Sequence, residues 1–500
     1  MFKKILIANR GEIAVRIMRT CQELGIRAVA VYSDPDRRSV HVGAADEAYA
    51  LDGVTSGETY LRADKIVAIA RRCGADAIHP GFGFLSENAA FAEACADAGI
   101  TFIGPRPDAI RAMGDKIIAK ETLSKAGVPI VPGFTVDVGQ HGAALVDQLK
   151  SRCAEIGYPV LIKAAAGGGG KGMRVVNSES EMAAALEAAQ REANAAFGDA
   201  RVFVEKYLSK SRHVEIQVFG DTHGNVVHLF ERECSIQRRH QKIVEESPSV
   251  ALTPELRERM GAAAVAAARA IGYVNAGTVE FMVDDAGAFY FLEVNTRLQV
   301  EHPVTELVTR RDLVKAQLLV AAGEPLPFTQ ADLKQEGHAM EVRVYAEDAA
   351  RGFLPSTGTV GVYREPVAPN VRVDSGIDAG SEVSVHYDPM LAKLIVWGRD
   401  RQEAIARMEW ALRHYVILGV TTNIDFLRAV VSHPKHVAGE VHTRFLDENP
   451  IDMTDGASPP DEAWIAAVLA AHSGGPRKAG AELAGAEAGP WRMAGAWKAY

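Results

Sequence analysis

Two glutamates past the middle of the chain have the spacing of a cation site. The segments GTVEFMV and AFYFLEVN have strand character and are joined by DDAG, a turn sequence, so they predict a hairpin. A tip at Ala286 and Gly287 places Glu280 directly opposite Glu293, and like charges that face each other across a ladder are destabilising. Followed by Asn295, the two carboxylates can instead share a hard cation with phosphate oxygens, as in magnesium-nucleotide sites. Apolar neighbours favour this metal site over one carboxylate on each face of a solvated hairpin.

A run of four glycines lies between two lysines in KAAAGGGGKGM, which begins at Lys163. The flanking segments YPVLIK and MRVV have strand character, so the run is predicted to be a hairpin loop. Bare backbone N–H groups near lysines suit phosphate. The P-loop pattern is absent, because Lys171 is followed by Gly172 rather than by Ser or Thr. A phosphate lid is therefore favoured over the alternative, a flexible solvent-exposed linker.

The segment NTRLQVEHPVTE follows the second glutamate and has neither strand nor helix periodicity, so we expect an irregular loop that stops at Pro303. Irregular loops on a rigid sheet often carry function. Arg297 offers a planar fork for a small oxyanion and Gln299 offers a further donor. Glu301 is a carboxylate that could act as a base. The competing interpretation is a structural ion-pair loop.

The segment ERECSIQRRHQKIVEESP mixes cations with glutamates. Its basic residues are Arg232, Arg238, Arg239, His240 and Lys242. Such a mixture is ordinarily a solvated surface, although together with the glycine-rich loop it could line a phosphate cleft. Cys234 in the same segment is interpreted as a packing residue rather than a nucleophile.

Composition narrows the possible functions. A chain of 500 residues with 48% hydrophobic content predicts two to four domains with substantial cores. A formal net charge of −9 argues against a general nucleic-acid surface. Five cysteines without C-x-x-C spacing suggest neither a disulfide framework nor zinc and fit a reducing compartment. No segment has the length of a membrane span and the start does not resemble a signal peptide, so a cytoplasmic protein is expected.

The order of patterns predicts an α/β and α+β multidomain chain. Alternating strands and helices predict a doubly wound α/β domain over residues 1–115, whose first turn, ANRGEI, lacks the dinucleotide pattern G-x-G-x-x-G. A smaller unit over 130–206 holds the glycine-rich loop and a helix at SESEMAAALEAAQREANAAFG. Residues 207–450 are rich in strands and predict a large antiparallel platform. Residues 451–500 have a linker composition with one short helix at PDEAWIAAVLAAH.

Seven motifs in order give the chain a family resemblance. They are ILIANRGEIA, HPGFGFLSEN, MGDK, KAAAGGGGKGM, ECSIQRRHQK, EVNTRLQVEHPVTE and YDPMLAKLIV. Together they resemble biotin carboxylase, a member of the ATP-grasp group, over about residues 1–450. The resemblance implies a pre-ATP-grasp N-terminal domain, an ATP-grasp lid and core, and a C-terminal biotin carboxylase domain. Another ATP-grasp ligase, such as a carbamoyl-phosphate synthetase, should lack HQKIVEE and RLQVEHPVTE. A non-catalytic scaffold should have lost some of the charged site residues.

The resemblance implies that ATP, bicarbonate and biotin meet with magnesium or manganese in one site. Residues matched to ATP are Lys116 and Lys163 at the phosphates, Gly168, Gly169 and Gly170 in the lid, Glu205, Lys206 and Leu208 at the adenine-side hinge, and His213, Gln237 and His240 in the nucleotide pocket. The matched metal ligands are Glu280 and Glu293, with Asn295 beside them. Residues matched to bicarbonate and biotin are Lys242, Arg297, Gln299, the backbone of Val300, Glu301 and Arg343. Of these, Glu301 is matched to the base and Arg343 to the arginine that stabilises the biotin enolate, while Arg297 and Lys242 complete the catalytic set.

The resemblance also implies partners. Relatives carry biotin on the lysine of Ala-Met-Lys-Met, and no methionine here is followed by lysine, so biotin is expected on a separate carrier protein or on a continuation of the chain. The expected partners are this carrier, further copies of the chain and a carboxyltransferase, and neither nucleic acid nor a membrane. The ending GPWRMAGAWKAY resembles the start of the segment after biotin carboxylase in long α subunits, so residues 451–500 are expected to be a linker or the start of a further domain. Acetyl-, propionyl- and methylcrotonyl-CoA systems are not separated by these residues.

Overall fold

The computed structural model describes residues 1–136, 143–165, 173–208, 210–239, 241–453 and 465. Residues Met1–Ile451 form one compact unit, and Asp452–Tyr500 form a second. The glycine-rich loop and His240 lie outside the described residues. The helix expected at PDEAWIAAVLAAH also lies outside them, apart from the exposed Ile465.

The N-terminal part contains a parallel five-stranded sheet in the order β3-β2-β1-β4-β5. The strands are β1 (Lys4–Ile7), β2 (Arg27–Tyr32), β3 (Glu47–Ala50), β4 (Ala77–His79) and β5 (Thr101–Phe102). Nearly continuous apolar runs such as KILI and RAVAVY form it because both faces of a parallel sheet are covered. The predicted doubly wound domain is confirmed, although β3 was not predicted, since its EAYA run is only partly buried.

Helices cover both faces of this sheet. Those of the N-terminal part are α1 (Gly11–Glu23), α2 (Val40–Ala44), α3 (Ala63–Cys73), α4 (Ala89–Asp97), α5 (Pro107–Gly114) and α6 (Lys116–Lys125). Helix α1 contributes to the core on one face and helices α3 and α4 to the core on the other. Helix α6 begins at Lys116 because the Asp115 carboxylate accepts hydrogen bonds from the backbone N–H groups of Ile117 and Ile118. This cap fixes the position of the first turn of α6, in which Lys116 lies.

A four-stranded antiparallel sheet follows in the order β6-β9-β7-β8. Its strands are β6 (Gly133–Thr135), β7 (Val160–Ala164), β8 (Arg174–Val176) and β9 (Val202–Lys206), with α7 (Ala143–Ile156), η1 (Glu179–Glu181) and α8 (Met182–Phe197). Alternate residues such as Val160, Ile162 and Val204 pack against the helices, which turns Lys163 and Glu205 to the opposite face. The pairing of β7 with β8 confirms the predicted hairpin around the glycine-rich loop.

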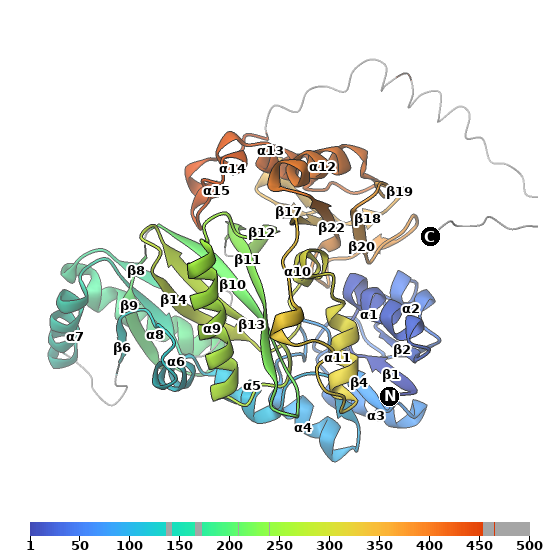
Figure 1. Cartoon of the computed structure of the whole chain (residues 1–500), viewed down its shortest axis with the longest axis horizontal. Helices are drawn as coiled ribbons and strands as arrows, with labels where there is room; N and C mark the ends of the chain where they lie inside the picture. Colours follow the sequence, from blue (N-terminus) through green and yellow to red (C-terminus); the bar gives the residue numbers. More distant parts are fainter. Residues whose placement is uncertain (137–142, 166–172, 209, 240, 454–464, 466–500) are drawn as a thin grey trace, which may run out of the picture. The chain divides into compact units, whose positions relative to one another are not determined.

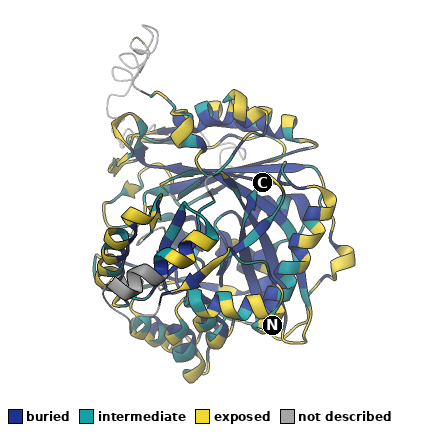
Figure 2. Ribbon diagram, turned by 90° about the vertical axis from the view of Figure 1, so that its left-hand side faces the viewer, coloured by how far each residue is buried: buried dark blue, intermediate teal, exposed yellow. Residues whose placement is uncertain are grey.

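The largest element is an eight-stranded antiparallel sheet in the order β14-β13-β10-β11-β12-β15-β22-β20 (Figure 1). Its strands are β10 (Ser211–Gly220), β11 (Val226–Arg238), β12 (Gln241–Ser247), β13 (Asn275–Asp284), β14 (Phe289–Asn295), β15 (His338–Tyr345), β20 (Val371–Ser375) and β22 (Met390–Gly398). The predicted antiparallel platform is therefore confirmed. Strands β10 and β15 are buried along almost their whole length, and β11 is buried over most of its residues (Figure 2).

The remaining elements cover this sheet or extend from it. The helices are α9 (Pro254–Ala270), α10 (His302–Thr309), α11 (Leu313–Ala321), α12 (Arg401–His414), α13 (Ile424–Val431), α14 (Pro434–Val437), α15 (Phe445–Glu448), η2 (Gln330–Asp332) and η3 (Ala349–Arg351). The short strands are β16 (Glu347–Asp348), β17 (Leu354–Pro355), β18 (Gly358–Thr359), β19 (Val362–Arg364), β21 (Glu382–Val383) and β23 (Val416–Leu418). No helix among the described residues is long and apolar enough to cross a bilayer.

Candidate active site

A row of buried charged side chains crosses the eight-stranded sheet. Cross-strand pairing places Glu293 opposite Glu280, Glu280 opposite Glu215, and Glu215 opposite Arg232. Farther along the sheet, Glu245 pairs with Glu341, and Lys393 lies between Arg343 and Asp374. Since apolar side chains normally fill such a face, a row of ionisable side chains indicates a functional surface rather than a packing surface.

Lys242 is the hub of this row. Its ammonium donates to Glu215 at 2.5 Å, to Glu280 at 2.8 Å and to Glu301 at 2.7 Å, so one cation joins three carboxylates from three different elements. Burial alone would lower the pKa of Lys242, but the three carboxylates raise it well above the ordinary lysine value. Lys242 therefore stays charged throughout the neutral range.

Glu301 is fully buried at the end of the loop after β14. Besides Lys242, the Arg343 guanidinium donates to its second carboxylate oxygen at 3.0 Å. Burial alone would raise the pKa of Glu301, but Lys242, Arg343 and Arg232 together hold it well below the ordinary glutamate value. An ionised carboxylate is thus held in a dry site, where it can accept a proton from a bound reactant.

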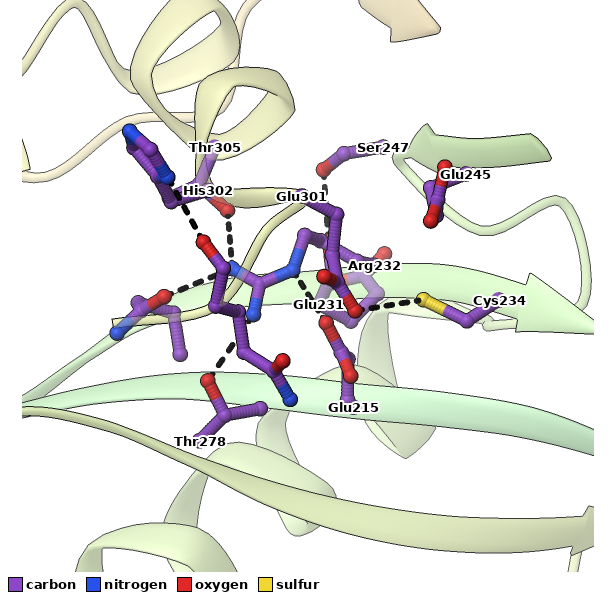
Figure 3. Close-up of polar contacts among 12 residues, drawn as sticks. Glu215, Glu231, Arg232, Cys234, Glu245, Ser247, Thr278, Glu301, His302 and Thr305 are labelled. Atoms are coloured by element: carbon purple, nitrogen blue, oxygen red, sulfur yellow. Dashed lines mark hydrogen bonds and ion pairs between the residues drawn. The ribbon is translucent and has the colours of Figure 1, made fainter. Parts of the chain in front are cut away.

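Arg232 fixes the floor of the site (Figure 3). The side chain has no exposed surface, and its guanidinium donates to Glu215 at 2.5 Å, to Thr278 at 3.0 Å and to Thr305 of α10 at 2.9 Å. A fourth bond reaches Gln217 at 2.8 Å. Five planar donors suit such a buried junction between strands and a helix. The expectation that this segment is a solvated mixed-charge surface was wrong for Arg232, because the pairing of β11 with β10 turns it into the core.

The loop after β14 carries the other predicted residues. The Arg297 guanidinium donates to the side-chain oxygens of Asn295 and Gln299, each at 2.9 Å, and to the Glu87 carboxylate at 3.0 Å. Gln299 in turn donates to Glu280 at 3.1 Å. The loop is shorter than predicted: residues His302–Thr309 form α10, and Pro303 lies in its first turn, where its missing N–H costs nothing, rather than ending the segment.

Glu280 and Glu293 face each other as predicted, but the hairpin that joins them differs from the predicted one. The hairpin closes at Asp284 and Ala288, with Gly287 at φ 76°, so its turn is one residue longer than the predicted tip. A bulge between Glu280 and Phe281 shifts the register by one residue and restores the facing pair.

The facing carboxylates fit a divalent cation. Lys242 and His213 hold the pKa of Glu280 well below its ordinary value despite burial. Burial and the neighbouring Glu280 charge raise the pKa of Glu293, and no hydrogen-bond donor contacts its carboxylate among the described residues. Because the Glu293 carboxylate has no hydrogen-bond donor among those residues and faces Glu280, the pair is suited to bind a hard cation. Asn295 is already engaged, because its amide donates to Glu280 at 2.8 Å and accepts from Arg297.

The four-stranded sheet contributes a second cluster of charges. Lys163 and Lys120 both contact the buried Glu205 carboxylate, one at each oxygen. Lys116 lies in the field of Glu293 on one side and of Lys163 and Glu205 on the other, and burial lowers its pKa. Of the two lysines predicted to bind phosphate, Lys116 interacts electrostatically with both Lys163 and the facing carboxylates, so it links the two clusters, as a magnesium-nucleotide site requires.

The other matched residues lie around these clusters. Gln237 donates to His213 at 2.8 Å, and His213 contacts Glu280 at 2.9 Å. The Lys206 ammonium instead donates to the Gly157 carbonyl at 2.7 Å, which ties it to its own sheet. Leu208 is half-buried, two residues beyond the end of β9.

Several residues of the site were not predicted from the sequence. They are Glu87, Lys120, Glu215, Glu245, Glu341 and Lys393, whereas Arg232 was named only as part of a segment that could line a phosphate cleft. A signal for Glu215 exists, since His213, Glu215 and Gln217 alternate with apolar residues in HVEIQV, but such alternation usually marks a solvated face. Lys393 is fully buried and donates to the Val300 carbonyl at 2.8 Å, which secures the backbone just before Glu301. Nothing in YDPMLAKLIV indicates this contact.

The fold and the two clusters define an ATP-dependent ligase of the ATP-grasp class. Three family models match the chain: "Biotin carboxylase, N-terminal domain" over residues 1–110, "Carbamoyl-phosphate synthase L chain, ATP binding domain" over 115–329, and "Biotin carboxylase C-terminal domain" over 341–448. The chain belongs to the biotin carboxylase family.

Named relatives agree with this assignment. The chain is 55% identical to the alpha subunit of the mitochondrial methylcrotonoyl-CoA carboxylase of Dictyostelium discoideum, over 89% of this chain and 63% of that protein. It is 54% identical to a pyruvate carboxylase subunit of Methanothermobacter thermautotrophicus, over 90% of each chain. A solved structure of the biotin carboxylase domain dimer of Hydrogenobacter thermophilus 2-oxoglutarate carboxylase, in complex with MgADP, ADP and bicarbonate, has a TM-score of 0.85 and 48% identity, covering 90% of this chain and 98% of that one. This chain thus spans less than two thirds of the methylcrotonoyl-CoA carboxylase relative.

Proposed function

We propose that the chain carboxylates biotin on a carrier protein, using ATP and bicarbonate, as the first half-reaction of a biotin-dependent carboxylase. The observation that carries this proposal is the fully buried, ionised Glu301 carboxylate between Lys242 and Arg343, which the Lys242 ammonium also joins to Glu280. Membership of the biotin carboxylase family supports the same reaction.

In this proposal the nucleotide phosphates lie between the two clusters. Lys116 and Lys163 neutralise phosphate oxygens from the side of the four-stranded sheet, while Glu280 and Glu293 hold magnesium from the other side. Magnesium, when bound, supplies charge neutralisation at the phosphate oxygens. Preorganised cations on both sides stabilise the charge that develops as the terminal phosphoryl group is transferred.

Bicarbonate is activated by the residues around Glu301. Arg297, Gln299 and Lys242 hold the anion, and Glu301 takes its proton. The resulting dianion attacks the terminal phosphorus of ATP, the bond to the bridging oxygen breaks, and carboxyphosphate and ADP form. An anion beside Lys242 and Arg297 adds negative charge next to Glu301, which raises its pKa from the low value of the free site and makes it a better base.

The second step transfers carbon dioxide to biotin. Carboxyphosphate breaks its carbon–oxygen bond to give carbon dioxide and phosphate. The released phosphate takes the proton of the biotin ureido nitrogen, and that nitrogen attacks the carbon of carbon dioxide. Arg343 stabilises the negative oxygen of the biotin enolate, since its guanidinium already faces Glu301 at the same position. Because the site is buried, water has little access to carboxyphosphate.

The proposal extends to partners. A biotin carrier protein or domain delivers biotin and a carboxyltransferase selects the acceptor, which agrees with relatives named for one acyl-CoA and two 2-oxo acids. The 2-oxo acids were not among the acceptors considered from the sequence.

We also propose self-association, supported by the paired and exposed Val362 and Leu418 and by the dimer described for the Hydrogenobacter domain. A cytoplasmic location is proposed on the strength of five unpaired, buried cysteines.

ADP release from magnesium-ATP and bicarbonate, with and without free biotin, tests the proposed function. Stimulation by biotin supports it. Stimulation by ammonia instead would assign the chain to carbamoyl-phosphate chemistry, a possibility raised by the family model over residues 115–329. No release under either condition would contradict both activities.

A further inference from the structure

Lys120 lies one turn beyond Lys116 on α6 and faces the same charged cluster. Its ammonium contacts one oxygen of the Glu205 carboxylate, and Lys163 contacts the other. Glu205 has 4% of its side chain exposed, Lys163 has 10% and Lys120 has 15%. One buried carboxylate is therefore shared between two lysines that come from different parts of the fold.

Glu205 creates an electrostatic problem for a phosphate site. A carboxylate beside Lys163 competes with phosphate for that ammonium, and it also repels the phosphate directly. Burial would raise the pKa of Glu205, but Lys163 and Lys120 lower it below the ordinary value, so the carboxylate is ionised at neutral pH. Without a second cation, Lys163 would be the partner of Glu205 and would not be available to a nucleotide.

We propose that Lys120 is a positioning residue of the nucleotide site, which neutralises Glu205 and so leaves Lys163 available for a phosphate group of the nucleotide. The inference rests on the proposed function only in taking Lys163 as a phosphate-binding residue. Neither the motifs of the sequence nor the matched family residues assign a role to Lys120.

The surroundings of Lys120 support this role. Helix α6 packs through Ala119 and Leu123 into the core below β13 and β14, so it holds Lys120 in place from outside the four-stranded sheet. The Lys120 ammonium also lies 4.3 Å from the centre of the Phe203 ring, a cation–π contact that keeps it beside Glu205. Lys120 can therefore stay on Glu205 when Lys163 turns to a ligand.

A substitution can remove this charge without overpacking. Lys120 lines a cavity of about 320 Å³ between α6, β6 and β9, whose apolar walls include Ile117, Val131 and Phe134. An unbranched methionine at position 120 can lie in this space along the path of the lysine stem. Lys125 also lines this cavity but is exposed in the last turn of the same helix, so it offers a matched control for loss of one positive charge from α6.

The test is a double-mutant cycle read by the binding of MgADP in isothermal titration calorimetry. In the wild-type background, Lys120→Met should weaken MgADP binding roughly tenfold, the effect of one charge-assisted hydrogen bond. In a Glu205→Gln background the same change should cost less than about twofold, because the carboxylate that competes for Lys163 is gone. Lys120→Arg should keep binding within about threefold of wild type, and Lys125→Met should have no effect. In turnover, Lys120→Met should raise the KM for ATP more than it lowers kcat.

Two results would overturn the proposal: Lys120→Met without loss of MgADP affinity, or an equal loss in both backgrounds, which would mean that Lys120 acts independently of Glu205. Melting temperatures of all variants separate a folding defect from a binding defect. The cycle uses neither bicarbonate nor biotin, so its failure is distinct from a failure of biotin-stimulated ADP release in the wild type.

Discussion

The five-stranded parallel sheet and the eight-stranded antiparallel sheet differ in what their buried faces contain. In the parallel sheet, β1 and β2 bury side chains such as Ile5, Leu6 and Val29 on both faces, with helices on either side. In the antiparallel sheet, Glu215 and Lys393 are equally buried but charged. The first arrangement gains free energy from apolar burial. The second carries a desolvation cost that only close pairing offsets, and such a cost is characteristic of a functional site.

The two sheets also cooperate. The parallel sheet contributes no strand residue to the charged row. It contributes the loop after β4, at the carboxyl end of a parallel strand, where Glu87 reaches Arg297. One sheet is therefore a support that positions a loop, and the other is the surface on which the chemistry is proposed to occur. Substitutions in each sheet should separate these two roles.

The largest expected effect is that of Glu301→Gln on the rate of catalysis, with folding unaffected. Glu301→Gln keeps the size of the side chain and removes its ability to accept the bicarbonate proton, so bicarbonate-dependent ADP release should fall by about 10²- to 10⁴-fold. MgADP binding should be unchanged, as measured by calorimetry. Turnover within threefold of wild type would remove Glu301 from the role of base.

A substitution in the parallel sheet should instead lower stability and leave catalysis unchanged. Ile78→Ala in β4 removes a fully buried side chain and should lower the free energy of unfolding by about 2–5 kcal/mol, as measured by urea denaturation. The kcat of the folded fraction should be unchanged. A large fall in kcat at full folding would show that the parallel sheet does more than support the loop.

The stability of the protein at acid pH should depend on a buried histidine of the parallel sheet. Burial lowers the pKa of His79 to about 4, against about 6.5 in the unfolded chain. Between these values the unfolded state binds the extra proton, so stability falls as pH falls, by about 2 kcal/mol between pH 7 and pH 5 for this group. His79→Gln should reduce that pH dependence by this amount in denaturation curves at the two pH values. An unchanged slope would mean that His79 is protonated in the folded state.

The smallest expected effect lies where the two regions meet. Glu87→Gln keeps an acceptor for Arg297 but removes the charge of a partly exposed ion pair, whose free energy is roughly 0–1 kcal/mol. The KM for bicarbonate should rise by roughly two- to fivefold while kcat changes little, in steady-state assays at saturating ATP. A loss as large as that of Glu301→Gln would place Glu87 within the chemistry rather than beside it.

The same contrast explains what the sequence could predict. Continuous apolar runs identify the parallel sheet because burial on both faces leaves a clear pattern. The pairing of Glu280 with Glu293 was predicted from facing carboxylates, although the turn was one residue longer than expected and a bulge compensated for it. No residue propensity in the sequence predicts that bulge.

The charged row was harder to predict. Alternation of charged and apolar residues has the same pattern whether the charged face meets water or other charges, so Glu215 and Arg232 were not recognised as buried. Lys393 and Lys120 act on residues 93 and 85 positions away along the chain, at Val300 and Glu205, and such contacts follow only from the tertiary fold. Pro303 was misinterpreted because a proline that ends one segment also suits the first turn of the next helix.

The formation of carboxybiotin from radiolabelled bicarbonate tests the central claim most directly. The wild-type chain with magnesium-ATP and free biotin should yield acid-labile label on biotin in proportion to the ADP released, and Glu301→Gln should yield none above background. ADP release without label on biotin, or equal labelling by both proteins, would contradict the assignment of the charged row to biotin carboxylation.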